Sequence, residues 1–209
     1  MDRVFENALE KEFIWLPEKG WGYFNVVANV YNQKYFDQFQ AYEGLERTEK
    51  LNKARVELVD RFLPTRNHML VDVGIGSGTF IKTRGGNTLG YDVNPAGIKW
   101  LKEQTKFMDV YEGVAPAISC WDSFEHIHDS TKLLQRVVRF AFICLPIFKD
   151  CEDVLKSKHF KKAEHVYYFT EKGIISYMQE HDFNCVLSSN FETDLGRENI
   201  QSFVFERCY

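Results

Sequence analysis

With 209 residues, 44% of them apolar, the chain is long enough to bury one substantial hydrophobic core. Its net charge of −4 and its pI near 5.9 exclude a global positive field that would draw it to nucleic acid or to an anionic membrane. Its longest apolar run, residues 140–148, is less than half of the roughly 20 residues that a membrane-spanning helix needs, so no membrane partner is expected.

The N-terminal part of the chain, residues 1–45, is rich in aromatic side chains from Phe5 to Tyr42. Pro17, Gly20 and Gly22 interrupt any regular periodicity there. This segment is predicted either to pack against a cofactor-binding core formed by residues 46–209 or to form a lid over a site in that core. Because no repeat or low-complexity tract divides the chain, a single domain over residues 1–209 is expected.

Hydrophobic periodicity in the rest of the chain predicts an α/β fold. Short apolar runs alternate with helical stretches, which is typical of a parallel sheet covered by helices on both faces. Strands are expected at residues 69–73 and 88–92, weakly near Phe107, and at 117–121 and 139–145. Helices are expected at 46–62, directly after Gly78, and at 95–104, 130–138 and 170–179. The last two apolar runs, 184–188 and 202–207, can pair as an antiparallel hairpin at a sheet edge.

The most informative segment runs from Val71 to Phe80 and has the sequence VDVGIGSGTF. Here an apolar strand leads into three closely spaced glycines and then into a helix. Glycine is required where the backbone turns sharply and approaches a ligand more closely than a Cβ atom allows, so the loop is typical of a site for a nucleotide-like cofactor. Dinucleotide-binding loops need the third glycine one position later, where this chain has Thr79, and a nicotinamide oxidoreductase is therefore disfavoured.

A carboxylate follows the second predicted strand. Asp92 lies at the carboxyl end of that strand, where it can accept hydrogen bonds from both hydroxyls of a ribose. Ligands of open α/β sheets bind at the carboxyl ends of the strands, so Asp92 and the glycine loop are expected at the same sheet edge. Together the two features predict a cofactor that contains a ribose.

The segments VDVGIGSG and GYDVNP resemble the cofactor-binding motifs of class I S-adenosylmethionine-dependent methyltransferases. The likeness continues through CWDSFEHI and EHVYYFTEKGIISYMQEHDF and covers roughly residues 50 to 207. It implies a Rossmann-like α/β fold with a seven-stranded, mostly parallel sheet, one antiparallel edge strand and helices on both faces. It also implies S-adenosylmethionine as the cofactor and methyl transfer as the activity.

The same resemblance implies a set of cofactor-binding residues. Asp72 and the loop glycines would lie beside the methionine moiety, Asp92 would hold the ribose, and Asp109 would reach the adenine amino group. Trp121 either packs on the adenine or belongs to the hydrophobic core. The full set is Asp72, Gly74, Ile75, Gly76, Gly78, Asp92, Val93, Asp109 and Trp121.

The Glu125-His126 pair after the fourth strand resembles that of quinone-precursor O-methyltransferases and, more distantly, of small-RNA 2′-O-methyltransferases. The resemblance implies His126 as an orienting residue or base, with Glu125 and the distant His165 in catalytic or structural hydrogen-bonding roles. In the RNA enzymes a further acidic residue completes a divalent metal site, and Asp122 would match it. Since Glu-His pairs also occur in relatives that need no metal, a magnesium-like or manganese-like ion is the alternative and not the expectation.

A small molecule is the expected acceptor, methylated at oxygen or nitrogen by in-line transfer. RNA or a nucleotide is a first alternative, which a basic groove around Lys156, Lys158, Lys161 and Lys162 would favour over a solvated loop. A regulatory protein that binds the cofactor without transferring methyl groups is a second alternative. DNA-base methylation is disfavoured, because the turn after the fourth strand lacks proline and the chain has no Pro-Cys pair.

The cysteines and the N-terminal sequence bear on location. Five scattered cysteines without a CxxC pair argue against a disulfide framework and against a structural zinc site. The first residues, MDRVFENALEKEF, include several acids and no continuous apolar segment, unlike a secretory or transit signal. A cytoplasmic protein with reduced thiols is therefore expected.

Overall fold

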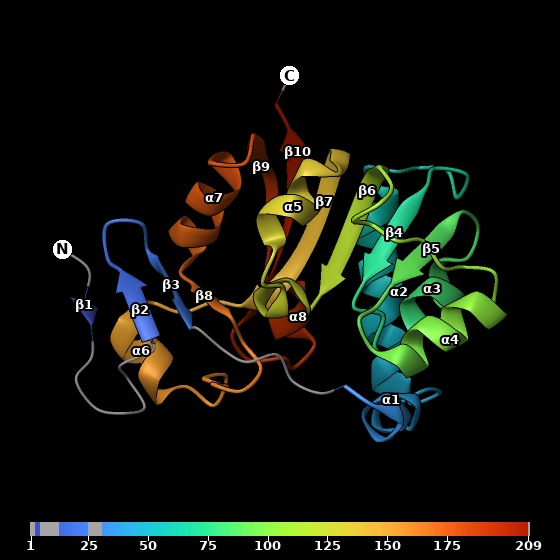
Figure 1. Ribbon diagram of the computed structural model, residues 1–209, viewed down its shortest axis with the longest axis horizontal. Coiled ribbons are helices and arrows are strands. Elements are labelled where there is room, and N and C mark those ends of the chain that lie inside the picture. Colours follow the sequence, from blue (N-terminus) through green and yellow to red (C-terminus); the bar gives the residue numbers. More distant parts are fainter. Residues whose placement is uncertain (1–2, 5–12, 25–30, 209) are drawn as a thin grey trace. The chain divides into compact units, whose positions relative to one another are not determined.

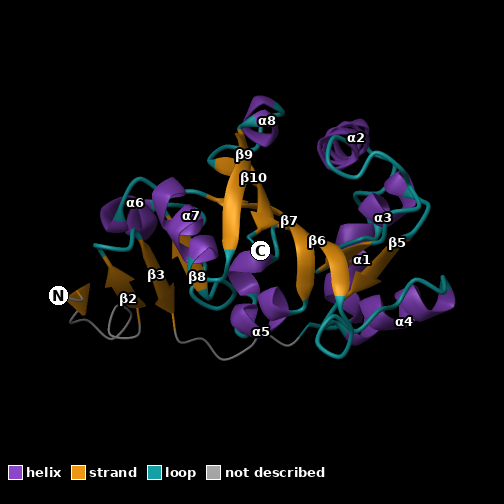
Figure 2. Cartoon of the chain, turned by 90° about the horizontal axis from the view of Figure 1, so that it is seen from above, coloured by secondary structure: helices purple, strands orange, loops and turns teal. Residues whose placement is uncertain are grey.

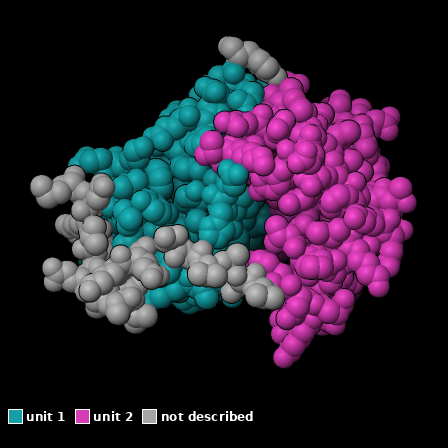
Figure 3. Space-filling model, viewed as in Figure 1, with its two compact units in different colours: residues 1–29, 122–130, 144–209 teal, residues 30–121, 131–143 magenta. Residues whose placement is uncertain are grey.

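The computed structural model describes residues 3–4, 13–24 and 31–208, and Figure 1 traces the chain through them. Phe5 and the other expected parts of the N-terminal segment at 5–12 and 25–30 lie outside the described residues. The chain divides into two compact units, shown in Figure 3. Unit 1 comprises Met1–Asn29, Asp122–Ser130 and Cys144–Tyr209, and unit 2 comprises Val30–Trp121 and Thr131–Ile143.

The larger of two sheets has six strands: β4 (Leu70–Val73), β5 (Thr88–Tyr91), β6 (Ala115–Trp121), β7 (Val137–Pro146), β9 (Phe183–Ser189) and β10 (Ile200–Arg207). Their order is β5-β4-β6-β7-β10-β9. Strand β4 pairs in parallel with β5 and β6, while β9 and β10 pair antiparallel, as expected for the terminal hairpin. This mostly parallel sheet with an antiparallel edge and surrounding helices confirms the predicted fold class.

The weak third strand expected near Phe107 does not form a full strand. Phe107 forms a single parallel bridge with Gly90, whose N–H donates to the Lys106 carbonyl at 2.8 Å and whose carbonyl accepts from Met108 N–H at 3.0 Å. The chain then turns, because Asp109 accepts hydrogen bonds from the backbone N–H groups of Tyr111 and Gly113. One bridged residue cannot extend a ladder, so the sheet has six strands and not the expected seven.

Helices α3 (Thr79–Arg84) and α4 (Pro95–Glu103) of unit 2 contact strand β5. Asn94 caps the helix that begins at Pro95, with its side-chain oxygen accepting from Ala96 N–H at 3.0 Å, as predicted. Helix α2 packs against α3, as Figure 2 shows. The helices are α1 (Gln33–Gln40), α2 (Glu46–Asp60), α3 (Thr79–Arg84), α4 (Pro95–Glu103) and α5 (Ser130–Gln135).

Helix α5 ends earlier than the predicted boundary at residue 138. Arg136 N–H closes a turn onto the Leu133 carbonyl at 3.0 Å, and the Arg136 carbonyl accepts from Ala115 N–H at 2.9 Å. Strand β7 therefore begins at Val137, where two successive β-branched residues favour extended backbone.

Unit 1 contains a second, four-stranded sheet that sequence analysis did not predict. Its strands are β1 (Arg3–Val4), β2 (Phe13–Leu16), β3 (Trp21–Phe24) and β8 (Tyr167–Phe169), in the order β1-β2-β3-β8. The helices of this unit are the 3-10 helix η1 (Phe124–His126), α6 (Cys151–Lys156), α7 (Glu171–Gln179) and α8 (Phe191–Asp194). Thr170 caps α7 through Gly173 N–H at 2.9 Å, as expected.

Part of the N-terminal aromatic segment forms the core of this sheet. Strands β2 and β3 form an antiparallel hairpin, and its turn contains Gly20 at a φ of 70°. Phe13 and Trp15 are buried against Tyr168 of β8. These described residues therefore pack into unit 1.

Among the described residues, no helix combines the length and the apolar character needed to cross a membrane.

Candidate functional site

The glycine loop between β4 and α3 lies entirely in unit 2. Gly74, Gly76 and Gly78 have φ angles of 78°, 53° and 75°, a region that residues with a Cβ atom rarely adopt. A Cβ atom at Gly78 would lie 2.5 Å from the indole of Trp100, whereas one at Gly76 would meet only the Phe39 ring, at 3.6 Å. Gly78 is thus required by internal packing, and Gly76 leaves the backbone of the loop more open.

Asp92 connects this loop to the end of β5. Its Oδ2 accepts a hydrogen bond from Ile75 N–H at 3.0 Å, and its Oδ1 accepts one from Asn94 N–H at 2.8 Å. Burial raises the pKa of Asp92, and these backbone hydrogen bonds oppose the rise. Val93, the next residue, is 62% exposed. The structure therefore brings Asp92 and the glycine loop to one sheet edge, as predicted, and the free lone pairs of the carboxylate can accept further donors.

Asp72 is almost fully buried beneath the loop. Its Oδ1 accepts a hydrogen bond from Ser119 Oγ at 2.7 Å, and the buried Arg55 provides a compensating positive charge. Burial nevertheless raises the pKa of Asp72 to about 7. Sequence analysis missed both partners. Ser119 stands directly opposite Asp72 in the β4–β6 register, and a serine within the apolar run AISCW was the available signal.

Two other candidates have local partners. The Asp109 carboxylate accepts from Tyr111 N–H at 2.9 Å. Burial raises the pKa of the Tyr91 phenol, and the nearby charges of Asp109 and Asp92 raise it further. Asp109 therefore lies in the neighbourhood of Asp92. The Trp121 ring is 7% exposed, with its centroid 5.2 Å from that of Phe80 and Arg55 above it at 5.0 Å. These contacts place Trp121 among buried side chains of unit 2.

Helix α1 covers the glycine loop within the same unit. Gln40 Nε2 donates to the Ser77 carbonyl at 2.6 Å, and Lys82 pairs with Glu43 at 2.6 Å. Asn94 Nδ2 donates to the Asn32 carbonyl at 3.1 Å, which connects the N-terminal ends of α1 and α4. This part of the N-terminal segment thus contacts the loop directly. The sequence left open whether the segment packs against the core or forms a lid, and it did not specify contact with the glycine loop.

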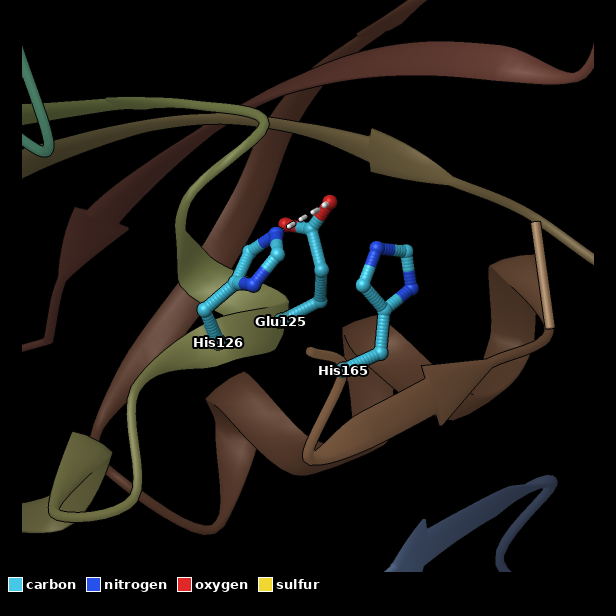
Figure 4. A group of neighbouring side chains, drawn as sticks. All are labelled: Glu125, His126 and His165. Atoms are coloured by element: carbon cyan, nitrogen blue, oxygen red, sulfur yellow. Dashed lines mark ion pairs between the residues drawn. The ribbon is translucent and has the colours of Figure 1, made fainter. Parts of the chain in front are cut away.

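The second group of candidates lies in unit 1 and is called here the Glu-His cluster: Glu125, His126 and His165. Figure 4 shows the three side chains converging, the first two from η1 and the third from the segment before β8. Their ligating atoms lie within 4.8 Å of one another, and the His126 and His165 ring centroids are 4.6 Å apart. The structure therefore unites the three residues that sequence analysis selected.

Burial controls the ionisation of this cluster. Glu125 and His165 are 2% and 3% exposed. Burial, reinforced by the nearby Asp122 charge, raises the pKa of Glu125 well above its usual value. It lowers the pKa of His126 and lowers that of His165 to about 2, so both imidazoles are neutral near pH 7.

Asp122 is engaged elsewhere. Its Oδ2 accepts from Arg197 Nη1 at 2.8 Å, and the same guanidinium contacts the fully buried Glu192. Together the opposite charges of Asp122 and Glu192 hold the pKa of Arg197 above its ordinary value. Asp122 therefore belongs with Arg197 and Glu192, and the Glu-His cluster forms without it.

The lysines that would mark an RNA-binding groove are mostly paired with acids. Lys158 contacts Glu198 at 2.6 Å, Lys161 contacts Glu164 at 3.3 Å, and Lys156 contacts Glu152. These ion pairs are largely exposed. They favour the solvated-loop interpretation of the lysine run.

Comparison with known proteins identifies the family of the chain and solved structures that share its fold. A family model described as a methyltransferase domain matches residues 45–188. No curated protein is similar enough in sequence to count as a relative. Many solved structures share the fold at low sequence identity, and three of them are described below.

The magnesium protoporphyrin IX methyltransferase of Synechocystis PCC 6803, with bound S-adenosylhomocysteine, has a TM-score of 0.60 at 14% identity, covering 85% of this chain and 95% of that one. The 1,6-didemethyltoxoflavin-N1-methyltransferase of Burkholderia thailandensis, with its substrate and S-adenosylhomocysteine, has a TM-score of 0.57 at 13% identity, covering 84% of each chain. An S-adenosylmethionine-dependent methyltransferase from Clostridium acetobutylicum ATCC 824 has a TM-score of 0.55 at 12% identity, covering 85% of this chain and 100% of that one.

Proposed function

The chain belongs to the family of methyltransferase domains, and on that premise we propose that it transfers the methyl group of S-adenosylmethionine to oxygen or nitrogen of a small molecule. The observation that carries the proposal is the glycine loop held to the end of β5 by the Asp92 carboxylate. Three left-handed glycines form a tight turn at a strand end, and the open surroundings of Gly76 let a ligand approach the backbone, which suits a nucleoside-containing cofactor.

The cofactor assignment follows from the charges at this edge. Asp92 is the proposed partner of the ribose hydroxyls, with Val93 beside it, and Asp109 is the proposed partner of the adenine amino group. Asp72 and the loop residues 74–78 are assigned to the methionine end, where a carboxylate stabilises a cationic sulfonium and ammonium. Trp121 is less suited to adenine, because Phe80 and Arg55 already cover its ring.

A small-molecule acceptor is supported by the structural relatives, two of which are described as acting on a magnesium porphyrin and on a toxoflavin precursor. We assign the acceptor side of the reaction to His126, Glu125 and His165, with neutral His126 as the orienting residue or base. The ion pairing of the lysine run weakens the RNA alternative. A single domain over residues 1–209 and a cytoplasmic location remain predictions from the sequence.

Calorimetric titration with S-adenosylmethionine tests the proposal. We expect Asp92→Ala to weaken binding by at least about tenfold, because it removes the ribose acceptor and releases Ile75 N–H. Asp194→Ala, which alters an exposed aspartate, is the matched control and should bind like the wild type. Unchanged affinity in Asp92→Ala, or a preference of the wild type for a nicotinamide nucleotide, would contradict the assignment.

Methyl transfer itself is tested by the release of S-adenosylhomocysteine from pools of metabolites and, separately, of RNA. We expect the wild type to release S-adenosylhomocysteine with a metabolite pool, and we expect His126→Ala to lose this activity. Turnover with RNA alone would reverse the choice of acceptor, and cofactor binding without any turnover would favour a regulatory role.

A further inference from the structure

The Glu-His cluster has the composition of a transition-metal centre. It offers one carboxylate oxygen and two imidazole nitrogens, all within 4.8 Å of one another. In Figure 4 the Glu125 carboxylate lies between the two rings in this view. Most of the cluster is shielded from solvent, since Glu125 and His165 are 2% and 3% exposed and the His126 side chain is 19% exposed.

Backbone hydrogen bonds fix the orientation of these side chains. His126 Nδ1 lies 2.9 Å from the Glu164 carbonyl, which can only accept, so Nδ1 carries the proton. Nε2 therefore presents a lone pair, and it lies 4.0 Å from Glu125 Oε1. Val166 N–H donates to the Glu125 carbonyl at 2.7 Å, which holds the segment carrying His165 against η1. A carbonyl that accepts from the distal nitrogen of an imidazole is the usual support of a metal-binding histidine.

One oxygen of the cluster has no donor among the described residues. Glu125 Oε2 is buried without a hydrogen-bond partner. The nearby cations do not serve it, because Arg197 bonds to Asp122 and Glu192, and Lys161 bonds to Glu164. A buried carboxylate oxygen without a partner is costly, and a bound cation would remove that cost.

We propose that Glu125, His126 and His165 bind one divalent transition-metal ion of the zinc class. Magnesium and calcium prefer shells of oxygen ligands and keep several waters, which two imidazoles in a largely shielded site do not supply. Two imidazoles and one carboxylate instead match the three-ligand sets of zinc and its first-row neighbours, with one coordination position left open. Asp122 is not a ligand, because Arg197 holds it at 2.8 Å.

The geometry requires only a small contraction on binding. Tetrahedral ligands about 2.1 Å from zinc are about 3.4 Å apart. The ligand atoms of the cluster lie within 4.8 Å of one another, so the ion would draw them together by at most about 1.4 Å, which rotations about side-chain bonds can supply.

Cobalt(II) provides a direct test, since it replaces zinc and gives visible absorption bands that report its ligands. The chelator-treated full-length protein is titrated with Co²⁺, and then with Zn²⁺ in competition. We expect one ion per chain, displacement by Zn²⁺, no displacement by millimolar Mg²⁺, and a rise in melting temperature with either transition metal.

Variants locate the ion. Glu125→Gln and His165→Gln should each weaken Co²⁺ binding by about 100-fold, since each removes a ligand. His181→Gln is the matched control, because His181 Nδ1 also lies 2.8 Å from a backbone carbonyl but belongs to no such cluster. Binding that is equally strong in both ligand variants would overturn the proposal, as would displacement by Mg²⁺.

The Co²⁺ titration of the wild-type protein tests the proposal even if a variant does not fold. A wild-type protein that binds no stoichiometric Co²⁺ would contradict the proposed metal site. The metal site goes beyond the proposed methyl transfer, and its test needs no methyl acceptor. With Nε2 bound to the ion and Nδ1 protonated, His126 would act as the orienting residue and not as the base. Failure of the metal titration leaves cofactor binding to be measured on its own, and failure of cofactor binding leaves the metal titration unaffected.

Discussion

The glycine-loop site of unit 2 and the Glu-His cluster of unit 1 satisfy their buried polar atoms in different ways. In the first, Asp92 accepts from two backbone N–H groups, and Asp72 accepts from Ser119. In the second, Glu125 Oε2 has no partner among the described residues. A site whose buried polar atoms already have hydrogen-bond partners in the protein keeps its shape without a ligand. A cluster with an unpartnered buried oxygen gains stability when a ligand binds that oxygen.

The largest effect is expected next to the Glu-His cluster, at Arg197. Arg197→Met should lower the free energy of unfolding by about 4 kcal/mol, because it leaves the fully buried Glu192 and also Asp122 without their counter-charge. Chemical denaturation at neutral pH measures this. Lys19→Met, which breaks an exposed ion pair with Glu180, should cost at most about 1 kcal/mol. Equal losses in the two variants would show that the Arg197 network contributes no more than a surface pair.

A smaller loss of stability is expected in the glycine loop. Gly78→Ala should destabilise the protein by about 3 kcal/mol, because the new Cβ adopts a positive φ and collides with the Trp100 ring. Gly76→Ala has the same backbone strain and no collision, so about 1 kcal/mol is expected. Thermal and urea unfolding of both variants provide the measurement. A Trp100→Leu background should recover most of the difference, and a failure to recover it would exclude the collision as the cause.

The smallest of the three effects depends on pH. The pKa of Asp72 is raised to about 7 in the folded protein, so between about pH 4 and about pH 7 the folded state holds a proton that the unfolded state has released. The contribution of Asp72 to the free energy of unfolding is therefore largest below about pH 4 and is lost as pH rises through about 7. Relative to Asp72→Asn, the wild type should therefore lose about 2.5 kcal/mol of unfolding free energy between about pH 5 and about pH 7.5. Urea unfolding of both proteins at the two pH values checks this. Parallel pH profiles would show that the carboxyl is not desolvated in the folded protein.

The glycine-loop site was predictable because its parts are close in sequence. Strand β4, the glycines, Asp92 and the Asn94 cap all lie within one strand-helix-strand-helix run, so local signals and the edge rule for parallel sheets place them together. The partners Ser119 and Arg55 were missed, since their contact with Asp72 depends on the register of β6 and on the burial of one charged face of α2.

The Glu-His cluster was predictable only through family resemblance. Glu125 and His165 are 40 residues apart, and no periodicity or spacing rule brings them together. The same limit explains the missed four-stranded sheet, where β3 pairs with β8 from the other end of the chain. The resemblance also suggested Asp122 as a fourth ligand, but in the structure its carboxylate forms an ion pair with the distant Arg197 instead.

The sequence alone determined the class of fold, the glycine turn and the acid after the second strand, because hydrophobic period, helix caps and glycine backbone freedom act over a few residues. Only the tertiary structure decided which ionisable groups meet: Arg55 with Asp72, Arg197 with Asp122, and two neutral imidazoles with Glu125. The physical reason is that the desolvation and pairing of a charge depend on every element packed around it, and no local stretch of sequence contains that information.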